Sequence, residues 1–293
     1  MHIHELENEY MAIRVSPMGA ELQSLYSKVF EREYLWQPGY ETWPHHSMLL
    51  FPNPGRIAHN RIIIGGKVFP ATMHGFAHKS VFDVVKADET EIILELAASD
   101  ETRRVFPYEF RFQVCFSVER ELVIQMLRVI NADNQPIYCC LGAHPGFYCP
   151  ITLDESGDDY ELVFDRPQYI DEMELQENTR LLTGRRKPML KGTARMPLSD
   201  HFFDGGPRLL DGVDANTVTM RSKKSGHFVE IGIEGFESMC LWGVGTMMSI
   251  LCIEPWCGTS DRVDTDHVWE NKPGIQKIEV GDIFERKLTF RVG

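Results

Sequence analysis

The sequence predicts an all-β protein, and three observations carry this prediction. Apolar residues recur at every second position in many short runs, as in Phe110, Phe112, Val114 and Phe116, which is the pattern of a strand with one buried face. Short clusters of turn-forming residues separate these runs. No amphipathic pattern of helical period extends beyond about three turns. Together these features indicate a large antiparallel β-sandwich or barrel.

The expected strands pair as hairpins in chain order. The first hairpin joins 61–64 to 67–69 through Gly65-Gly66, a two-residue turn of the type that hairpins favour. The later runs are 82–85 with 92–96, 110–118 with 122–130, 218–221 with 228–233, 239–244 with 248–253, and a closing strand at 285–292. The more polar stretches 155–159 and 176–198 are expected to be surface excursions, so that residues 1–293 form one domain.

The composition is that of an ordinary globular protein with an acidic surface. The chain has 293 residues and a formal net charge of -13, which disfavours nucleic acid and anionic membranes as partners. Its seven cysteines form no C-x-x-C motif and predict reduced thiols in the cytoplasm. The first residues lack the features of a signal peptide, and no apolar run reaches the ~20 residues of a membrane span.

Glu254 is the most informative residue, because it is a carboxylate inside the apolar run from Ile250 to Trp256. A buried carboxylate is costly unless it is paired or used, and its pKa usually shifts. Pro255 removes a backbone donor and predicts that the strand ends at the glutamate. Trp256 adds a flat apolar surface, which is typical of sugar sites when it lies beside a carboxylate. The alternative is a buried ion pair with Arg56, but the pattern favours a functional group.

His144 follows a second apolar, strand-like run and is bracketed by Gly142, Pro145 and Gly146. The glycines would loosen the backbone while the proline fixes it, which predicts a strand that ends in a specific bend. A core histidine bonded to a carbonyl explains the same pattern equally well. An acid and a base, each at the end of a buried strand, suggest proton-transfer chemistry.

Two loop residues are further candidates for ligand binding. His74 precedes Gly75, whose missing side chain would allow a ligand to approach the backbone closely. Arg56 follows Pro52-Asn53-Pro54-Gly55 and carries a guanidinium suited to a hydroxyl, carboxylate or phosphate. Taken alone, His74 is better explained as a satisfied loop histidine, and Arg56 equally well as a solvated cation.

The sequence shows no motif for a metal or a nucleotide. His2 with His4, and His45 with His46, lack partner ligands at metal spacing, so no metal is expected. There is no G-x-S-x-G or P-loop, and Trp242-Gly243-Val244-Gly245 lies between expected strands rather than at the start of a helix. No organic cofactor is expected either.

Five segments spread over nearly the whole chain form a specific ordered set. They are Gly19 to Leu22, Phe51 to Arg56, His74 to Ala77, Gly142 to Phe147, and Cys252 to Trp256 with Gly258 and Asp261. In this order they resemble the aldose 1-epimerase (galactose mutarotase-like) superfamily, and in particular its LacX-like branch. The resemblance implies a large, twisted antiparallel β-sandwich that interconverts the α and β anomers of a hexose without a cofactor.

The resemblance also implies roles for the candidate residues. Glu254 matches the general base, which takes the proton of the anomeric hydroxyl, and His144 matches the general acid, which protonates the ring oxygen. Arg56 and His74 match substrate-positioning groups, and Trp256 would form a wall of the site. Both catalytic groups are expected to titrate near the working pH.

Two departures from the family pattern leave the substrate open. Members of the family use a mid-chain aspartate to bind sugar hydroxyls, and this chain offers Asp200 and Asp204, of which Asp204 is our candidate. The family often has arginine where His78 stands, and His78, Lys79 and Arg56 together would suit a hexose 6-phosphate. A non-catalytic sugar-binding or sensor protein is a second alternative. A glycoside hydrolase ranks last because it needs two carboxylates. A homodimer is left open.

Overall fold

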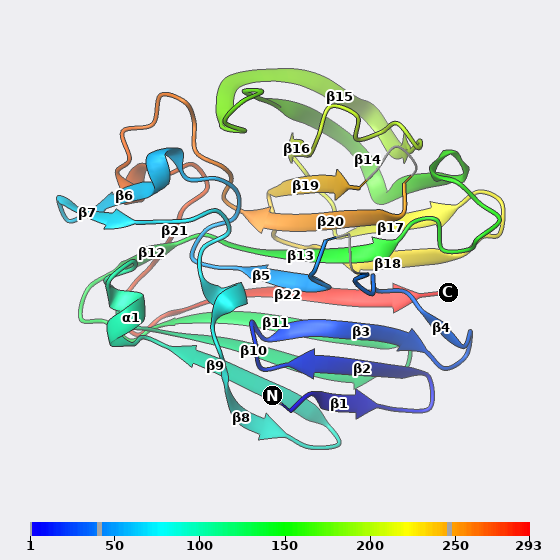
Figure 1. The fold of residues 1–293 in the computed structure, drawn as a ribbon, viewed down its shortest axis with the longest axis horizontal. Coiled ribbons are helices and arrows are strands. Elements are labelled where there is room, and N and C mark those ends of the chain that lie inside the picture. Colours follow the sequence, from blue (N-terminus) through cyan, green and yellow to red (C-terminus); the bar gives the residue numbers. More distant parts are fainter. Residues whose placement is uncertain (1, 40–42, 245–247) are drawn as a thin grey trace.

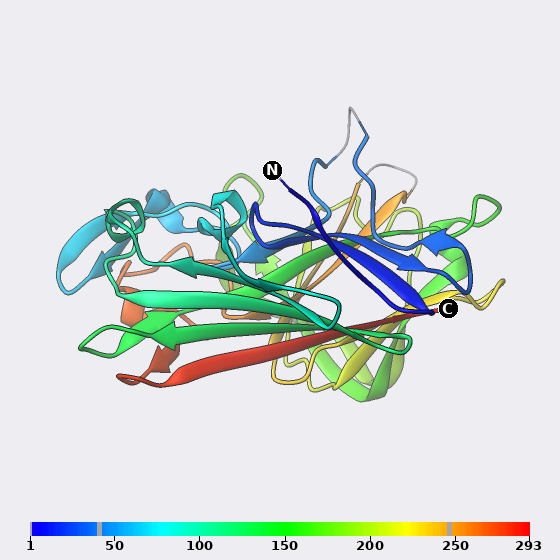
Figure 2. The same cartoon turned by 90° about the horizontal axis from the view of Figure 1, so that it is seen from below.

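The computed structural model describes residues 2–39, 43–244 and 248–293 and confirms the predicted all-β class (Figure 1). Within these residues, fourteen strands form one antiparallel sheet and four N-terminal strands form a second sheet. Figure 2 shows the N-terminal strands crossing over the face of the large sheet, as in a sandwich. One cluster of buried side chains includes residues of both sheets, from Leu6 in the N-terminal sheet to Val292 in the last strand of the chain, which belongs to the large sheet.

The strand order of the large sheet places segments from both halves of the chain side by side. In spatial order it runs β5 (Ser47–Leu50), β13 (Leu141–Tyr148), β20 (Ile250–Cys257), β19 (Ser238–Gly243), β16 (Arg208–Asp211), β14 (Tyr160–Leu175), β17 (Thr217–Ser222), β18 (Phe228–Gly232), β22 (Ile283–Val292), β11 (Leu122–Asn131), β10 (Phe110–Glu119), β9 (Glu91–Ala97) and β8 (Asp83–Ala87), with β15 (Leu182–Pro197) paired to β14.

The remaining elements are short. The N-terminal sheet contains β1 (His4–Glu7), β2 (Met11–Ser16), β3 (Glu21–Ser27) and β4 (Arg32–Glu33), and two separate pairs are β6 (Arg61–Ile64) with β7 (Lys67–Pro70) and β12 (Ile137–Cys139) with β21 (Gln276–Ile278). Helix α1 (Asp100–Arg103) is a single turn, and 3-10 turns occur at Ala58–Asn60, Ala77–Lys79, Gly157–Asp159 and Trp269–Asn271. No helix in the described part of the chain is long and apolar enough to cross a membrane.

The predicted hairpins form where the period-two pattern is clearest. In β10, Phe110, Phe112, Val114 and Phe116 are all buried, and the strand pairs with β11 along its whole length. The β6–β7 hairpin turns at Gly65 and Gly66, which have positive φ angles of 56° and 75°. A two-residue turn whose central residues both have positive φ has the twist that an antiparallel hairpin needs.

Residues 176–198 lie at the surface, as predicted, but most of this stretch is the long strand β15, which the sequence did not predict. It pairs with β14, and most of its side chains are exposed, so it shows no alternation of buried apolar residues. Register shifts interrupt the β14–β15 pairing at several points, which bends the strands. Figure 1 shows this pair curving as an arm above β19 and β20.

Strands β13 and β20 also differ from the prediction, because neither ends at its titratable residue. The β13–β20 ladder pairs Leu141 and Gly142 at one end and Gly146 to Tyr148 at the other. Pro145 and Pro255 fall in the stretch between these paired ends. A proline inside a sheet is tolerated where no ladder bond is required from it. The two strands therefore continue through the prolines, with a local gap in the ladder.

Candidate active site

Glu254 and His144 face each other across the adjacent strands β20 and β13. The ladder pairs Gly142 with Trp256 and Gly146 with Cys252, so counting two residues inward from either pair sets His144 opposite Glu254. His144 Nε2 lies 3.2 Å from Glu254 Oε1, and the two side chains are only 7% and 1% exposed. The proposed acid and base are thus brought together, and the polar partner of Glu254 is His144 rather than Arg56.

Period two explains how a carboxylate is buried in β20 without entering the main core. Leu251, Ile253 and Cys257 belong to the large hydrophobic core. Cys252 and Trp256 belong to smaller clusters, so they and Glu254 point to the opposite face of the strand. Glu254 is therefore part of a floor that is covered by other side chains.

The glycines around His144 provide space rather than flexibility. A Cβ on Gly142 would lie 2.8 Å from Trp256 Cδ1, and a Cβ on Gly146 would lie 2.7 Å from Trp43 Cζ3. Both glycines share the face of β13 that carries His144, since residues of equal parity lie on one side. The two tryptophan rings can therefore pack on either side of the imidazole, within a strand that continues.

Burial controls the charge of Glu254 and His144. It raises the pKa of Glu254 well above its ordinary value, and the Cys240 thiol and Trp256 indole only partly oppose this effect. Burial also lowers the pKa of His144 well below its ordinary value, and the nearby His74 adds to the effect. Both shifts favour neutral side chains. The favoured form therefore has a protonated Glu254 beside a neutral His144, with Oε1 and Nε2 3.2 Å apart.

His74 presents a neutral ring with a defined tautomer. Gly55 N–H donates to His74 Nδ1 at 3.2 Å, so the proton of the neutral ring is on Nε2. Burial lowers the pKa of His74 to about 3, and His78, Arg56 and Lys79 lower it further by their positive charge. The ring centroid of His74 lies 5.7 Å from that of His144, which gives the site a hydrogen-bond donor beside the acid.

Gly75 is required by the protein backbone and not by a ligand. A Cβ at this position would lie 2.1 Å from the Phe51 carbonyl oxygen, and the residue has a φ of 69°. Phe76 N–H donates to the same oxygen at 2.9 Å. The group that closely approaches Gly75 is therefore the Phe51 backbone and not a ligand. This contact joins the loop that carries His74 to the segment that leads to Arg56.

The loop that carries Arg56 is fixed by the segment after β20. Arg56 N–H donates to Ser260 Oγ at 3.1 Å, and Asp261 N–H donates to the Arg56 carbonyl at 2.8 Å. Asp261 also accepts from Ala58 N–H at 2.9 Å and pairs with the buried Lys272. These bonds hold the backbone, and the Arg56 side chain is exposed at the cavity.

These groups surround one cavity of about 350 Å³. That volume lies in the range of small-molecule sites. Its lining comprises Trp43, Met48, Gly55, Arg56, Met73, His74, His144, Leu175, Arg180, Pro207, Leu209, Cys240, Trp242, Glu254, Trp256 and Ser260. Five of the six predicted residues therefore meet in one place, namely Glu254, His144, Arg56, His74 and Trp256. Glu254 Oε2 and Trp256 Nε1 are both buried there, and neither has a hydrogen-bond partner among the described residues.

The sequence patterns did not reveal three residues of this wall. Trp43 stacks on His144 with ring centroids 4.7 Å apart, and Trp242 meets Trp43 edge-on at 5.8 Å. Arg180 enters from the turn between β14 and β15. In the sequence Trp242 stands out only as part of a glycine-containing motif, and Trp43 precedes a proline in a stretch without periodicity. A tryptophan in a loop is a usable signal only when its neighbours in space are known.

Asp204 lies outside this cavity. Its side chain is 60% exposed, and its carboxylate is 3.2 Å from His201 Nδ1. Asp200 accepts a hydrogen bond from Gly157 N–H at 2.8 Å and so stabilises a turn. His78 and Lys79 lie next to His74 but are not among the described residues that line the cavity. Among the described residues, no group of three or more His, Cys, Asp or Glu could hold a metal.

The chain is thus a large antiparallel β-sandwich protein with a buried glutamate–histidine pair at the floor of a cavity that tryptophan rings line. The aldose 1-epimerase family model matches residues 2–272 of the chain. The chain belongs to the aldose 1-epimerase family.

Relatives of known sequence and structure agree with this assignment. The chain is 27% identical over 283 residues to the chromosomal LacX protein of Lactococcus lactis subsp. lactis, and the match covers 94% of both chains. A solved structure of a galactose mutarotase related enzyme from Lactobacillus acidophilus is 26% identical, with a TM-score of 0.93 over 100% of this chain and 97% of that one. A galactose mutarotase-like protein from Lactobacillus casei has the same fold, with 24% identity, a TM-score of 0.93 and full coverage of both chains.

Proposed function

We propose that this protein is an aldose 1-epimerase that interconverts the α and β anomers of a hexose. The observation that carries the proposal is the contact of 3.2 Å between His144 Nε2 and Glu254 Oε1 at the floor of the cavity. Anomerisation through the open-chain sugar needs one group that accepts a proton and one that donates a proton at the same time. A buried pair that holds a single proton supplies both.

Ring opening starts from the form with Glu254 as carboxylate and His144 as imidazolium. Glu254 accepts the proton of the O1 hydroxyl, and the O1–C1 bond becomes a carbonyl. The C1–O5 bond breaks, and its electron pair goes to O5, which receives the proton of His144. Rotation about C1–C2 exposes the other carbonyl face. On closure His144 takes the proton of the O5 hydroxyl as O5 attacks C1, and Glu254 gives its proton back to O1, so both side chains return to their starting forms after one turnover.

The pair reaches this reactive form by a short proton transfer. In the free protein, burial favours protonated Glu254 with neutral His144, and moving that proton across 3.2 Å gives the carboxylate and the imidazolium. A sugar hydroxyl that donates to Glu254 Oε2 would stabilise the carboxylate, because hydrogen bonds to the charged form lower the pKa. Substrate binding itself would therefore favour the reactive form.

The other residues of the wall would bind and orient the sugar. His74 Nε2–H and the Arg56 guanidinium donate hydrogen bonds, which suit the ring oxygen and the hydroxyl groups. Trp256 and Trp43 offer flat apolar surfaces for the C–H faces of a pyranose. A hexose held in this way would present O1 and O5 to the two members of one pair, as the reaction requires.

Saturation-transfer NMR of equilibrated glucose and galactose tests the proposal. The protein should accelerate exchange between the two anomeric proton signals above the spontaneous rate, in proportion to its concentration. Binding of either sugar by calorimetry without any acceleration would instead support a sugar-binding or sensor protein. Neither binding nor acceleration with any hexose or hexose phosphate would remove the proposal.

A further inference from the structure

The wall of the proposed active site carries more positive than negative charge. Among the described residues that line it, Arg56 and Arg180 are cations and Glu254 is the one acidic residue. Burial favours the protonated form of Glu254, since it raises the pKa of this carboxyl well above the ordinary value. The whole chain has a formal net charge of -13, so a cationic cavity is a local exception to an acidic protein. Such an exception indicates a ligand that carries negative charge.

Neither arginine of this wall is neutralised by the protein. Within the described residues, no carboxylate forms an ion pair with Arg56 or Arg180, and the one side-chain hydrogen bond of Arg180 goes from Nη1 to the Gly205 carbonyl at 3.1 Å. A guanidinium has five N–H donors in a planar fork. The donors that remain on Arg180 can therefore bind an anion without breaking an internal pair.

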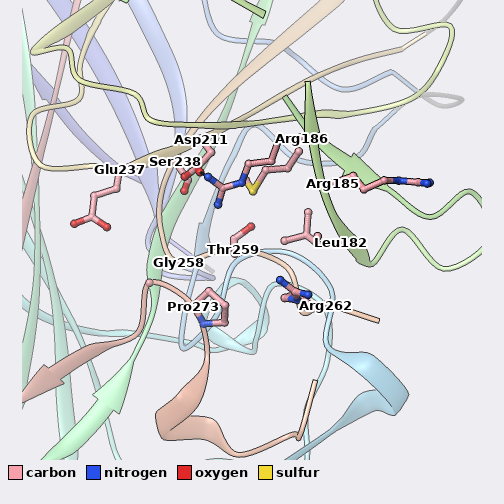
Figure 3. Close-up of a pocket in the computed structure, with 13 residues that line it drawn as sticks. Leu182, Arg185, Arg186, Asp211, Glu237, Ser238, Gly258, Thr259, Arg262 and Pro273 are labelled. Carbon is pink, nitrogen blue, oxygen red and sulfur yellow. Dashed lines mark ion pairs between the residues drawn. The ribbon is translucent and has the colours of Figure 1, made fainter. Parts of the chain in front are cut away.

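A second cavity offers a contrast, because its arginines are paired with carboxylates. It has a volume of about 290 Å³, and Figure 3 shows Arg186 beside Asp211 within it. Arg186 pairs with Asp211, Arg262 pairs with Asp264 at 2.8 Å, and Arg185 also has a carboxylate partner. The positive charges of this second cavity are balanced by the protein itself. In the second cavity each arginine thus has a carboxylate partner, whereas neither arginine of the first cavity has one among the described residues.

Arg180 is also held in place before any ligand arrives. It has a φ of 58° in the turn between β14 and β15, where its N–H donates to the Gln176 carbonyl at 2.8 Å. Gln176 N–H in turn donates to the Leu181 carbonyl at 2.8 Å. With Nη1 bonded to Gly205, both the backbone and the guanidinium are fixed. A preordered cation loses little conformational entropy when it binds an anion.

The two arginines lie toward the open side of the cavity. Arg56 is exposed and Arg180 is half-buried, whereas His144 and Glu254 are buried at the floor. The anomeric carbon must reach the floor for the proposed reaction. A group bound by the arginines therefore belongs to a part of the sugar that is remote from C1.

We propose that Arg180 is a specificity-determining residue that, together with Arg56, binds an anionic substituent of the sugar, namely a phosphate ester or a carboxylate remote from C1. This inference rests on the proposed function and narrows its substrate class. Arg56 alone cannot define that class, because an arginine at its position suits neutral hydroxyls as well. Arg180 adds a second guanidinium group whose position is fixed, and two guanidinium groups are suited to bind a dianion.

The test compares glucose, glucose 6-phosphate and glucuronate with the wild type and with the variants Arg180→Ala, Arg180→Lys and Arg185→Ala. Saturation-transfer NMR gives kcat/KM, and calorimetry gives binding. Arg185→Ala is the matched control, because it removes the same charge from the neighbouring strand β15 but at a residue that pairs with Glu174 and lines the second cavity. Thermal unfolding checks that each variant is folded.

The wild type is expected to prefer a charged sugar over glucose. Arg180→Ala should lower that preference by about 10- to 100-fold, mainly through KM, because a hydrogen bond to a charged group has about this effect on binding. Arg180→Lys should restore part of the preference, and Arg185→Ala should leave it unchanged. A higher affinity for glucose 6-phosphate than for glucuronate would assign a phosphate, and the reverse would assign a carboxylate.

Two results would overturn the inference. One is a wild type that binds glucose as tightly as both charged sugars. The other is an equal loss for all three sugars in Arg180→Ala, which would indicate a structural role. Failure of the proposed function is distinguishable, because it would abolish acceleration for every sugar while calorimetry still measured the preference for an anion and its dependence on Arg180.

Discussion

Replacing Glu254 by glutamine separates the chemical role of this residue from its structural one. The side chain is 1% exposed, and the amide keeps its shape while it removes the group that accepts and returns a proton. General-base catalysis typically contributes about 10²- to 10⁴-fold. The variant is therefore expected to lose turnover by this factor, which corresponds to about 3 to 5 kcal/mol in the activation barrier.

The same change should have little effect on folding at acidic pH. Burial raises the pKa of Glu254, so the folded protein holds a neutral carboxyl that glutamine resembles closely. We expect the free energies of unfolding of the variant and the wild type to differ by no more than ~1 kcal/mol at acidic pH, which corresponds to about 2 °C in melting temperature for a protein of this size. Above the ordinary glutamate value of 4.5, the unfolded wild type has released this proton while the folded protein retains it. The contribution of Glu254 to the free energy of unfolding of the wild type therefore falls as pH rises toward the raised pKa. Over this pH range, Glu254→Gln should become more stable relative to the wild type.

The assay is saturation-transfer NMR with the best substrate, combined with melting curves at several pH values. The matched control is Glu161→Gln, because Glu161 is a buried carboxylate that pairs with Arg195 on β14 and β15, outside the cavity. The control should keep wild-type turnover. The reasoning is refuted if Glu254→Gln retains turnover within tenfold of the wild type (about 1.4 kcal/mol), or if its activity disappears only because the protein unfolds.

The remaining predictions concern the residues around this pair. His144→Asn should lower turnover by about 10²-fold or more while calorimetry still detects sugar binding, and unchanged turnover would remove its role as the acid. Burial lowers the pKa of His144 and raises that of Glu254. The acid limb of the pH profile of kcat/KM, where the rate falls as pH is lowered, should therefore lie below pH 6.5, the ordinary histidine value. An acid limb above this pH would contradict the assignment. Trp43→Ala removes the ring stacked at 4.7 Å and should move that limb upward, as a pH–rate profile would detect. Gly142→Ala places a Cβ 2.8 Å from Trp256 and should destabilise the fold by about 1 to 3 kcal/mol, measured by denaturant unfolding, and an unchanged midpoint would show that the ring can move.

The fold was predictable where one face of a strand is buried and the other is solvated. Strand β10 is such a case, since its buried residues alternate with exposed or half-buried ones along most of its length. Strand β15 is not, because most of its side chains are exposed, and the pairing with β14 gives no apolar pattern. Strand β20 is buried on both faces, which conceals the period and made Pro255 look like a strand end. The alternating pattern is absent both from a strand exposed on both faces and from a strand buried on both faces. It appears only when the two faces of a strand differ in their exposure to solvent.

The candidate site was predictable where a titratable residue interrupts an apolar run. Glu254 and His144 stand out in this way, and their buried environments explain why. Arg180 and Trp43 reach the cavity from loops, and no local property distinguishes them from solvated residues. Asp204 was selected by its place in the family pattern alone, and the structure puts it outside the cavity. Long-range geometry, which a local pattern does not contain, decides all three of these positions.

The division between floor and rim has a functional consequence. Glu254 and His144 are on the adjacent strands β20 and β13, whose other faces pack in the main core, so their separation is set by the sheet itself. Arg56 and Arg180 come from loops, and each loop is held by its own hydrogen bonds. A change in either loop can alter which sugar is bound without moving the pair. Substrate choice and proton transfer are therefore separable in this fold, which is why the preference between charged and neutral sugars should respond to Arg180 while turnover responds to Glu254.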